Sequence, residues 1–175
     1  MTTVLTAAQQ AKERLPRNVL ATKPTDLATL VATLSALSAA ELAAHIDRVL
    51  DDVEGTAGQL RALLPEPGRR ARLQAEATAL FQQYPDATAR PPLFGALLGV
   101  KDILCSAGLP TRCGSALPPE VFADMVENSA VSRCKAAGAL VLGKTVTTEF
   151  ASSEPGATTN PWDPNHTPGG SSQVR

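Results

Sequence analysis

Apolar residues in the first half of the chain recur every three or four positions, which is the spacing of amphipathic helices. A first helix is predicted to begin after Thr25 or Asp26, because either residue is a suitable N-cap. Its apolar face consists of Leu27, Leu30, Val31, Leu34 and Leu37. We interpret this stripe, and those that follow, as packing faces rather than cofactor contacts.

A second helix is predicted from Ser38, which forms a capping-box match with Glu41, to about Gly55. Its apolar face consists of Leu42, Ile46, Val49, Leu50 and Val53. A third, shorter helical piece carries Leu60, Leu63 and Leu64 before the sequence Pro-Glu-Pro-Gly breaks it. A fourth helix is predicted from about residue 70 to residue 84, where Pro85 stops it.

The pattern changes after residue 90, where short apolar runs replace the helical period. Residues 93–100 predict a buried strand that ends at Lys101-Asp102, and residues 139–142 predict a second one that ends at Gly143-Lys144. A helix between them is predicted from Asn128 or Ser129 to Gly138. Strand, helix and strand in this order predict two parallel strands. From Ser152 onward, the composition predicts an extended loop.

These elements predict an α/β protein with an N-terminal tail (1–24), a helical arm (25–89) and an α/β segment (90–175). The hydrophobic content of 43% is sufficient for a packed core. A net charge of −1, an aromatic content of 3% and the lack of a basic stripe argue against nucleic-acid binding. No apolar run approaches the ~20 residues of a membrane span.

The cysteines and histidines give no sign of a metal site or a disulfide framework. Cys105, Cys113 and Cys134 are odd in number and lack a C-x-x-C spacing. His45 and His166 are too far apart to complete a metal site alone. Without a secretory signal in the tail, reduced thiols and a cytoplasmic location are expected.

Two places could carry chemistry. Lys101 directly follows an apolar strand, so its amine is either solvated at the surface or held inside as a base. The segment Gly169-Gly170-Ser171-Ser172 is either a flexible linker or a loop whose N–H groups and hydroxyls bind an anion. Taken alone, each local sequence favours the less specific interpretation.

Three segments in this order resemble the amidase-signature family. The first reads Gly-Ala-Leu-Leu-Gly-Val-Lys-Asp at residues 95–102, followed by Ala-Gly-Leu-Pro-Thr at 107–111 and Gly-Ser at 114–115. The second reads Ala-Ala-Gly-Ala-Leu-Val-Leu-Gly-Lys-Thr at 136–145, followed by Glu-Phe-Ala at 149–151. The third reads Asn-Pro-Trp-Asp-Pro at 160–164 and Thr-Pro-Gly-Gly-Ser-Ser at 167–172. The resemblance covers about half of the chain.

The resemblance implies hydrolysis of carbon–nitrogen amide bonds by a Ser-cisSer-Lys triad in a mixed-sheet α/β/α domain. Lys101 would be the base, and Ser171, held by a cis peptide bond, would relay the proton. Gly169, Gly170 and Ser172 would belong to the loop at the substrate and oxyanion. The family mechanism uses neither a metal nor an organic cofactor, and its substrate is a small-molecule amide.

The resemblance stops at Ser172, because Gln-Val-Arg replaces the family's next glycine pair. The serine nucleophile follows that point in the family, so we expect a truncated catalytic domain that is inactive by itself. A rival hypothesis is a non-catalytic protein whose helices bind a partner. The sequence leaves the substrate and the oligomeric state open, and a homo-oligomer is compatible with it.

Overall fold

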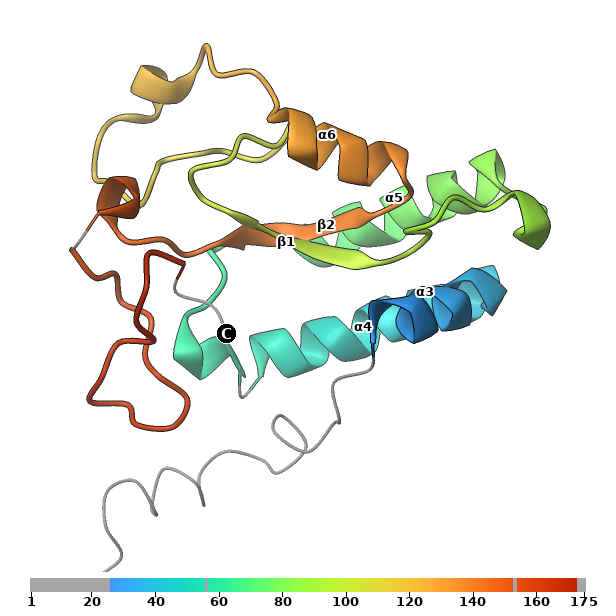
Figure 1. The fold of residues 1–175 in the computed structure, drawn as a ribbon, viewed down its shortest axis with the longest axis horizontal. Coiled ribbons are helices and arrows are strands. Elements are labelled where there is room, and N and C mark those ends of the chain that lie inside the picture. The colour runs from blue at the N-terminus through green and yellow to red at the C-terminus, as the bar shows by residue number, and fades with distance from the viewer. Residues whose placement is uncertain (1–25, 56, 153, 173–175) are drawn as a thin grey trace, which may run out of the picture.

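The computed structural model describes residues 26–55, 57–152 and 154–172, so the expected N-terminal tail lies outside the described residues. Labels follow Figure 1. The α-helices and strands are α3 (Leu27–Ala36), α4 (Ala39–Glu54), α5 (Arg69–Gln83), β1 (Leu97–Lys101), α6 (Ser129–Ala136) and β2 (Leu140–Thr145). Short 3-10 turns occur at Ala57–Leu60, Ala87–Ala89, Pro119–Phe122 and Glu149–Ala151.

The predicted helix starts are confirmed by their caps. Asp26 accepts a hydrogen bond from the Thr29 N–H at 2.9 Å, which fixes the first turn of α3. Ser38 and Glu41 form the predicted capping box at the start of α4. The Glu41 carboxylate accepts from the Ser38 N–H at 2.8 Å, and these contacts lower the pKa of Glu41. Local sequence therefore determines where these helices begin.

The prediction of a third helical piece through Leu60, Leu63 and Leu64 is only partly correct. The 3-10 turn ends at Leu60, and Leu63 instead forms an antiparallel bridge with Thr145 at the end of β2. The Leu64 N–H donates to the Lys144 carbonyl at 2.8 Å. The reason is that the outer edge of β2 offers backbone partners that a short, proline-terminated helix could not supply.

The two predicted strands exist, but their boundaries differ from the prediction. Residues 92–95 form a turn, and β1 begins only at Leu97 and includes Lys101. Gly95 has a φ of +73° in this turn, and its N–H donates to the Gly138 carbonyl at 3.0 Å. Strand β2 extends to Thr145, one residue beyond the predicted end at Gly143-Lys144, and the Leu63 segment pairs with it there.

Strands β1 and β2 pair in parallel, as the order of strand, helix and strand predicted. The register places Leu97 opposite Leu140 and Lys101 opposite Thr145, with an irregularity after Leu98. Gly99 lies so close to Thr145 that a Cβ there would be 2.8 Å from its methyl group. A larger residue at this position would therefore force the Thr145 side chain to move.

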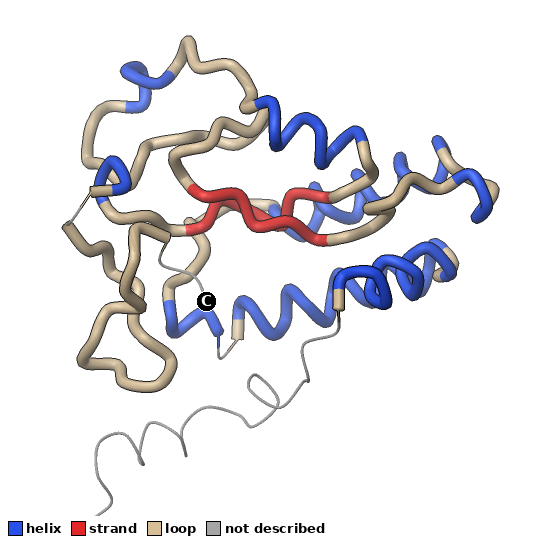
Figure 2. Tube along the Cα trace, in the orientation of Figure 1, coloured by secondary structure: helices blue, strands red, loops and turns tan. Residues whose placement is uncertain are grey.

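Helices lie on both sides of the strand pair, with α6 on one side and α3 and α4 on the other, and α5 packs against both β2 and α4 (Figures 1 and 2). On the α6 side, Val131 packs with Val100 and Val141. On the other side, the helices and strands share a core that consists of Leu34, Leu42, Ile46, Leu50, Leu73, Ala77, Leu80, Phe94, Ala96 and Leu140. The described part of the chain is thus a layered α/β structure. The boundary between helical arm and α/β segment remains a prediction.

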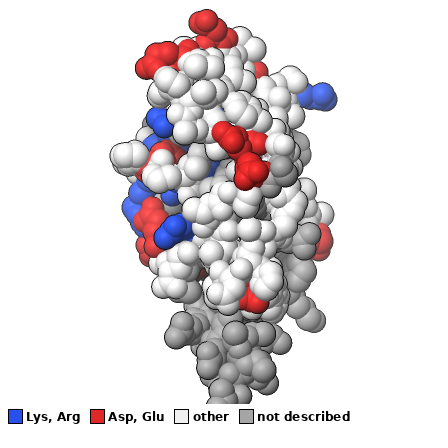
Figure 3. Space-filling model, turned by 90° about the vertical axis from the view of Figure 1, so that its left-hand side faces the viewer, with Lys and Arg blue, Asp and Glu red and all other residues white. Residues whose placement is uncertain are grey.

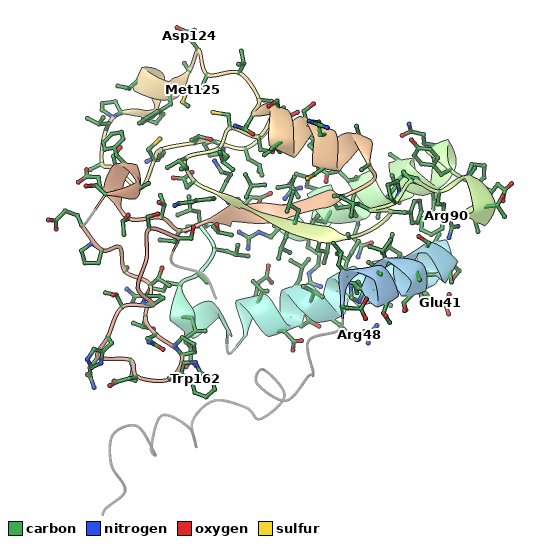
Figure 4. The ribbon with its side chains drawn as sticks, in the orientation of Figure 1. Glu41, Arg48, Arg90, Asp124, Met125 and Trp162 are labelled. Atoms are coloured by element: carbon green, nitrogen blue, oxygen red, sulfur yellow. The ribbon has the colours of Figure 1, made fainter. Side chains whose placement is uncertain are left out.

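Arg90 joins the end of α3 to α5 and to the turn before β1. Its guanidinium carbon lies 4.6 Å from the ring centre of Phe81 and 4.5 Å from that of Phe94. Its Nη1 donates to the carbonyls of Ser35 and Leu37 at the C-terminus of α3. Figure 4 labels Arg90 beside these helices. One side chain therefore satisfies a helix end and packs between two aromatic rings.

Within the described residues, no helix is both long enough and apolar enough to cross a bilayer. The loops that follow the strands lie on the side of the molecule that Figure 3 turns toward the viewer, and most atoms in that view are uncharged. Figure 4 places Met125 on the loop before α6, at the top of the view, and Trp162 on the long C-terminal loop, at the bottom. Both side chains are exposed.

Candidate active site

The structure brings Lys101 and Ser171 together, although they are far apart in the sequence. Lys101 is the last residue of β1, and its Nζ donates a hydrogen bond to the Ser171 Oγ at 2.6 Å. The lysine side chain is half-buried. Of the two interpretations of Lys101, the geometry agrees with an amine held against a hydroxyl and disagrees with one that is free in solvent.

Ser171 is held by the segment that follows β2. Its carbonyl accepts hydrogen bonds from the Thr147 Oγ1 at 3.0 Å and from the Thr148 N–H at 3.1 Å. Ser172 continues this contact through an antiparallel bridge with Thr147. Both threonines are buried, so they provide a fixed support for the serine.

The backbone conformation explains why two glycines precede Ser171. Gly169 and Gly170 have φ values of +78° and +67°, and other residues would be strained at both positions. The expected cis peptide bond is not found, because every peptide bond among the described residues is trans. Trans is the lower-energy form by about 3–4 kcal/mol at a non-proline bond. The trans backbone nevertheless carries the Ser171 hydroxyl to Lys101.

Ser171 borders a hollow of about 420 Å³ at the end of the strands. The residues that line it are Thr148, Ala151, Ser152, Pro155, Thr167, Gly169, Gly170 and Ser171. The Thr148 hydroxyl is buried and has no hydrogen-bond partner among the described residues. Ser172 is exposed and does not line the hollow. The hollow thus presents hydroxyl groups beside the lysine–serine pair.

Backbone strain lies next to this hollow. Phe150 and Ala151 have φ values of +46° and +57°, which cost of order 1–3 kcal/mol each for residues other than glycine. The Phe150 N–H donates to the Cys113 carbonyl at 2.8 Å, which holds the turn in place. The Phe150 side chain is 52% exposed. Contacts with a buried loop, rather than burial of the aromatic ring, therefore stabilise this conformation.

A buried ion pair lies directly behind Lys101, and sequence reasoning gave it no role. The Lys144 Nζ lies 3.0 Å from the Asp102 Oδ1 and donates to the Thr111 Oγ1 at 2.5 Å. Both charged side chains are almost completely buried. The available signal was the alternation of side chains at the end of β1, because it directs Lys101 and the next residue, Asp102, to opposite sides.

The cysteines near this pair are free thiols. Burial raises the pKa of the Cys113 thiol, and the negative charge of Asp102 adds to the rise. Both effects disfavour a thiolate, so Cys113 is a poor nucleophile. Nowhere in residues 26–55, 57–152 and 154–172 do three His, Cys, Asp or Glu side chains come close enough to hold a metal ion.

A larger cavity of about 600 Å³ lies elsewhere, along the outer side of β2. The residues that line it are Leu64, Pro65, Glu66, Pro67, Arg72, Gly108, Leu109, Pro110, Arg112 and Lys144. Neither Lys101 nor Ser171 reaches it. Size alone would favour this cavity, but the smaller hollow is lined by Ser171, whose hydroxyl is paired with the Lys101 amine, so we place the candidate chemistry there.

Known proteins resemble this chain in sequence, and solved structures resemble it in fold. A glutamyl-tRNA(Gln) amidotransferase subunit from Synechococcus sp. (strain RCC307) is 39% identical over 135 residues, which cover 73% of this chain and 27% of the relative. The corresponding chloroplastic/mitochondrial subunit from Zea mays is 35% identical over 94% of this chain and 32% of its own length. The chain thus spans about a third or less of these relatives.

A solved structure gives the same picture. The native peptide amidase from Stenotrophomonas maltophilia superposes with a TM-score of 0.68 and 29% sequence identity, over 86% of this chain and 32% of the amidase. The sequence profile of the Amidase family matches residues 44–173, a stretch that includes Lys101, Asp102, Lys144 and Ser171. Since the matched stretch is well over half of the chain and contains the paired lysine and serine, this protein belongs to the amidase family.

Proposed function

We propose that Lys101 and Ser171 form the proton-transfer pair of an amide hydrolase that works by serine acyl transfer. The observation that carries the proposal is the 2.6 Å contact between the Lys101 Nζ and the Ser171 Oγ. This distance allows a proton to pass between the two groups. The amidases and amidotransferase subunits that resemble this chain support an amide as the substrate.

In the proposed reaction, a serine hydroxyl attacks the amide carbon while its proton passes to the Ser171 Oγ. The Ser171 proton passes at the same time to the Lys101 amine, which acts as the base. The carbon–nitrogen bond then breaks, and the proton returns through Ser171 to the leaving nitrogen. Water repeats the cycle on the acyl-enzyme and releases the acid.

The attacking serine is the part that the described residues do not place. Ser152 lines the same hollow as Ser171, but no described side chain other than Lys101 is hydrogen-bonded to the Ser171 hydroxyl. The relatives are several times longer than the matched stretch, so their remaining sequence is the proposed source of the nucleophile. We therefore expect no turnover of amides by these 175 residues alone.

A chimera tests this function directly. Residues 44–172 would replace the matching part of the Stenotrophomonas maltophilia peptide amidase, and hydrolysis of a peptide amide would be measured. Lys101→Met and Ser171→Ala should each lower kcat by about 10²–10⁴-fold, the usual contribution of general acid–base catalysis. Ser132→Ala, at an exposed serine of α6, is the matched control and should leave kcat unchanged. Full activity of the Lys101→Met chimera would contradict the proposal.

The unfused chain provides a second test. A fluorophosphonate probe, which labels activated serines, should leave the purified 175-residue chain unlabelled. If labelling occurs, peptide mapping identifies the serine. Labelling of Ser152 or Ser171 that depends on Lys101 would show that the chain already contains its own nucleophile.

A further inference from the structure

We propose that Asp102, through its buried ion pair with Lys144, is the residue that positions both Lys101 and Ser171. This inference rests on the proposed function, because it explains how the proton-transfer pair is held. Asp102 contacts neither the Lys101 amine nor the Ser171 hydroxyl in the described contacts. It is therefore a positioning residue, which acts through the segments that it joins.

Asp102 connects three segments of the chain at one point. Its N–H donates to the Thr145 carbonyl at 3.0 Å, which joins the ends of β1 and β2. Its carbonyl accepts from the Cys113 N–H at 3.0 Å, and its carboxylate accepts from the Gly114 N–H at 3.1 Å. The Arg112 N–H approaches the same carboxylate at 3.3 Å. The loop 112–114 is thus wrapped around one buried side chain.

The first consequence concerns Lys101, the last residue of β1, which Asp102 follows directly. The Asp102 N–H continues the hydrogen bonding between the strands, and adjacent residues in extended backbone point to opposite sides, so the fixed Asp102 side chain directs the lysine toward Ser171. Both the backbone and the carboxylate of Asp102 are bonded, which leaves the strand end little freedom to rotate. The bonded Asp102 therefore determines the direction in which the Lys101 side chain points.

The second consequence concerns Ser171, which Asp102 reaches through Gly114 and Thr147. Gly114 lies so close to the 147–148 backbone that a Cβ would be 2.9 Å from the Thr147 carbonyl oxygen. Thr147 in turn donates to the Ser171 carbonyl. The loop around Asp102 therefore packs against Thr147, which in turn holds Ser171. The positions of both Lys101 and Ser171 thus depend on the Asp102 carboxylate.

The charges explain why this arrangement is sensitive to substitution. The Lys144 ammonium neutralises the Asp102 carboxylate and also donates a hydrogen bond to the Thr111 hydroxyl, so each buried charge has partners. Removing one charge would leave the other buried and unpaired, whereas removing both leaves none. Comparing variants of Asp102 alone with variants of Asp102 and Lys144 together therefore separates misplacement of Lys101 from loss of folding.

Labelling of Lys101 in the full chain by an amine-acylating reagent, quantified by mass spectrometry, tests the inference. Ser171→Ala removes the hydroxyl that holds the amine, so Lys101 should react about 2–10-fold faster, the factor that one lost hydrogen bond supplies. Asp102→Asn should give the same increase. Asp102→Asn combined with Ser171→Ala should give no further increase, because both act on one contact.

Controls distinguish the possible failures. Glu127→Gln breaks the more exposed ion pair with Lys135 and should leave Lys101 labelling unchanged. If Asp102→Asn loses the helical circular dichroism, the pair variant Asp102→Asn/Lys144→Met is used instead. An unchanged rate in Ser171→Ala would contradict the proposed function. A faster rate in Ser171→Ala with the wild-type rate in folded Asp102 variants would overturn the positioning role alone.

Discussion

At the scale of single residues, neighbouring side chains in this protein have opposite surroundings. Lys101 ends β1 and is hydrogen-bonded to the Ser171 hydroxyl, whereas Asp102 is completely buried against Lys144. Thr147 and Thr148 show the same contrast after β2. The Thr147 hydroxyl donates to the Ser171 carbonyl, but the buried Thr148 hydroxyl has no partner in the described part of the chain. Exchange of each threonine for valine should therefore have opposite effects.

Thr148→Val should raise the free energy of unfolding by about 1 kcal/mol, because it replaces an unpaired buried hydroxyl with a methyl group of the same shape. Thr147→Val should lower it by about 1 kcal/mol, because the Ser171 carbonyl loses a donor. Urea unfolding of both variants measures the difference. A loss of stability in Thr148→Val would show that its hydroxyl has a partner in solution.

At the scale of elements, contacts between helix ends and turns hold the layers in position. Arg90 satisfies carbonyls at the end of α3 while it packs between Phe81 of α5 and Phe94 of the turn before β1. The two rings meet edge to face, with centres 5.1 Å apart. A single guanidinium thus connects the helical half of the chain to the first strand.

Arg90→Ala should lower the free energy of unfolding by about 2–4 kcal/mol, because it removes hydrogen bonds from a charged group together with two cation–π contacts. Arg90→Lys should recover less than half of the loss, since an ammonium cannot both stack between the rings and reach two carbonyls. Arg48, exposed on α4, provides the control, and its exchange for alanine should cost within about 0.5 kcal/mol. Thermal and urea unfolding measure all three variants. Equal stabilities of Arg90→Ala and Arg48→Ala would contradict this role.

At the scale of the whole molecule, the helices and strands share one core. Leu42, Ile46 and Leu50 of α4 are completely buried together with Phe94 and with Leu140 of β2. The apolar face of α4 is therefore already occupied within the described structure. This finding gives no support to the rival hypothesis, in which the same faces bind a partner protein.

A fragment of residues 26–84 tests that rival at this scale. It lacks Phe94, Ala96 and Leu140 of the core, so it should lose the cooperative thermal transition of the full chain and most of its helical circular dichroism. The 175-residue chain is the control. A helical, cooperatively unfolding fragment that also captures a partner would favour an interaction protein over an amidase segment.

Local sequence was sufficient to predict several features, because short-range contacts determine them. The capping box at Ser38, the stop after α6 at Gly138 and the parallel order of the strands follow from residue types that lie next to one another. The motifs around Lys101 and Ser171 were also recognised in the sequence, together with the family. Strand boundaries were less accurate, since Leu63 and the turn at Gly95 are fixed by contacts with β2 and Gly138.

The amino-acid sequence by itself determined the helix starts, the strand order, the family and the two residues proposed to move protons. Only the tertiary structure decided that the Lys101 amine meets the Ser171 hydroxyl, and that Asp102 and Lys144 are paired out of water behind them. The physical reason is the distance along the chain over which the interactions act. Caps and periodicity act within a few residues along the chain, whereas burial and pairing of charges depend on segments that only folding brings together.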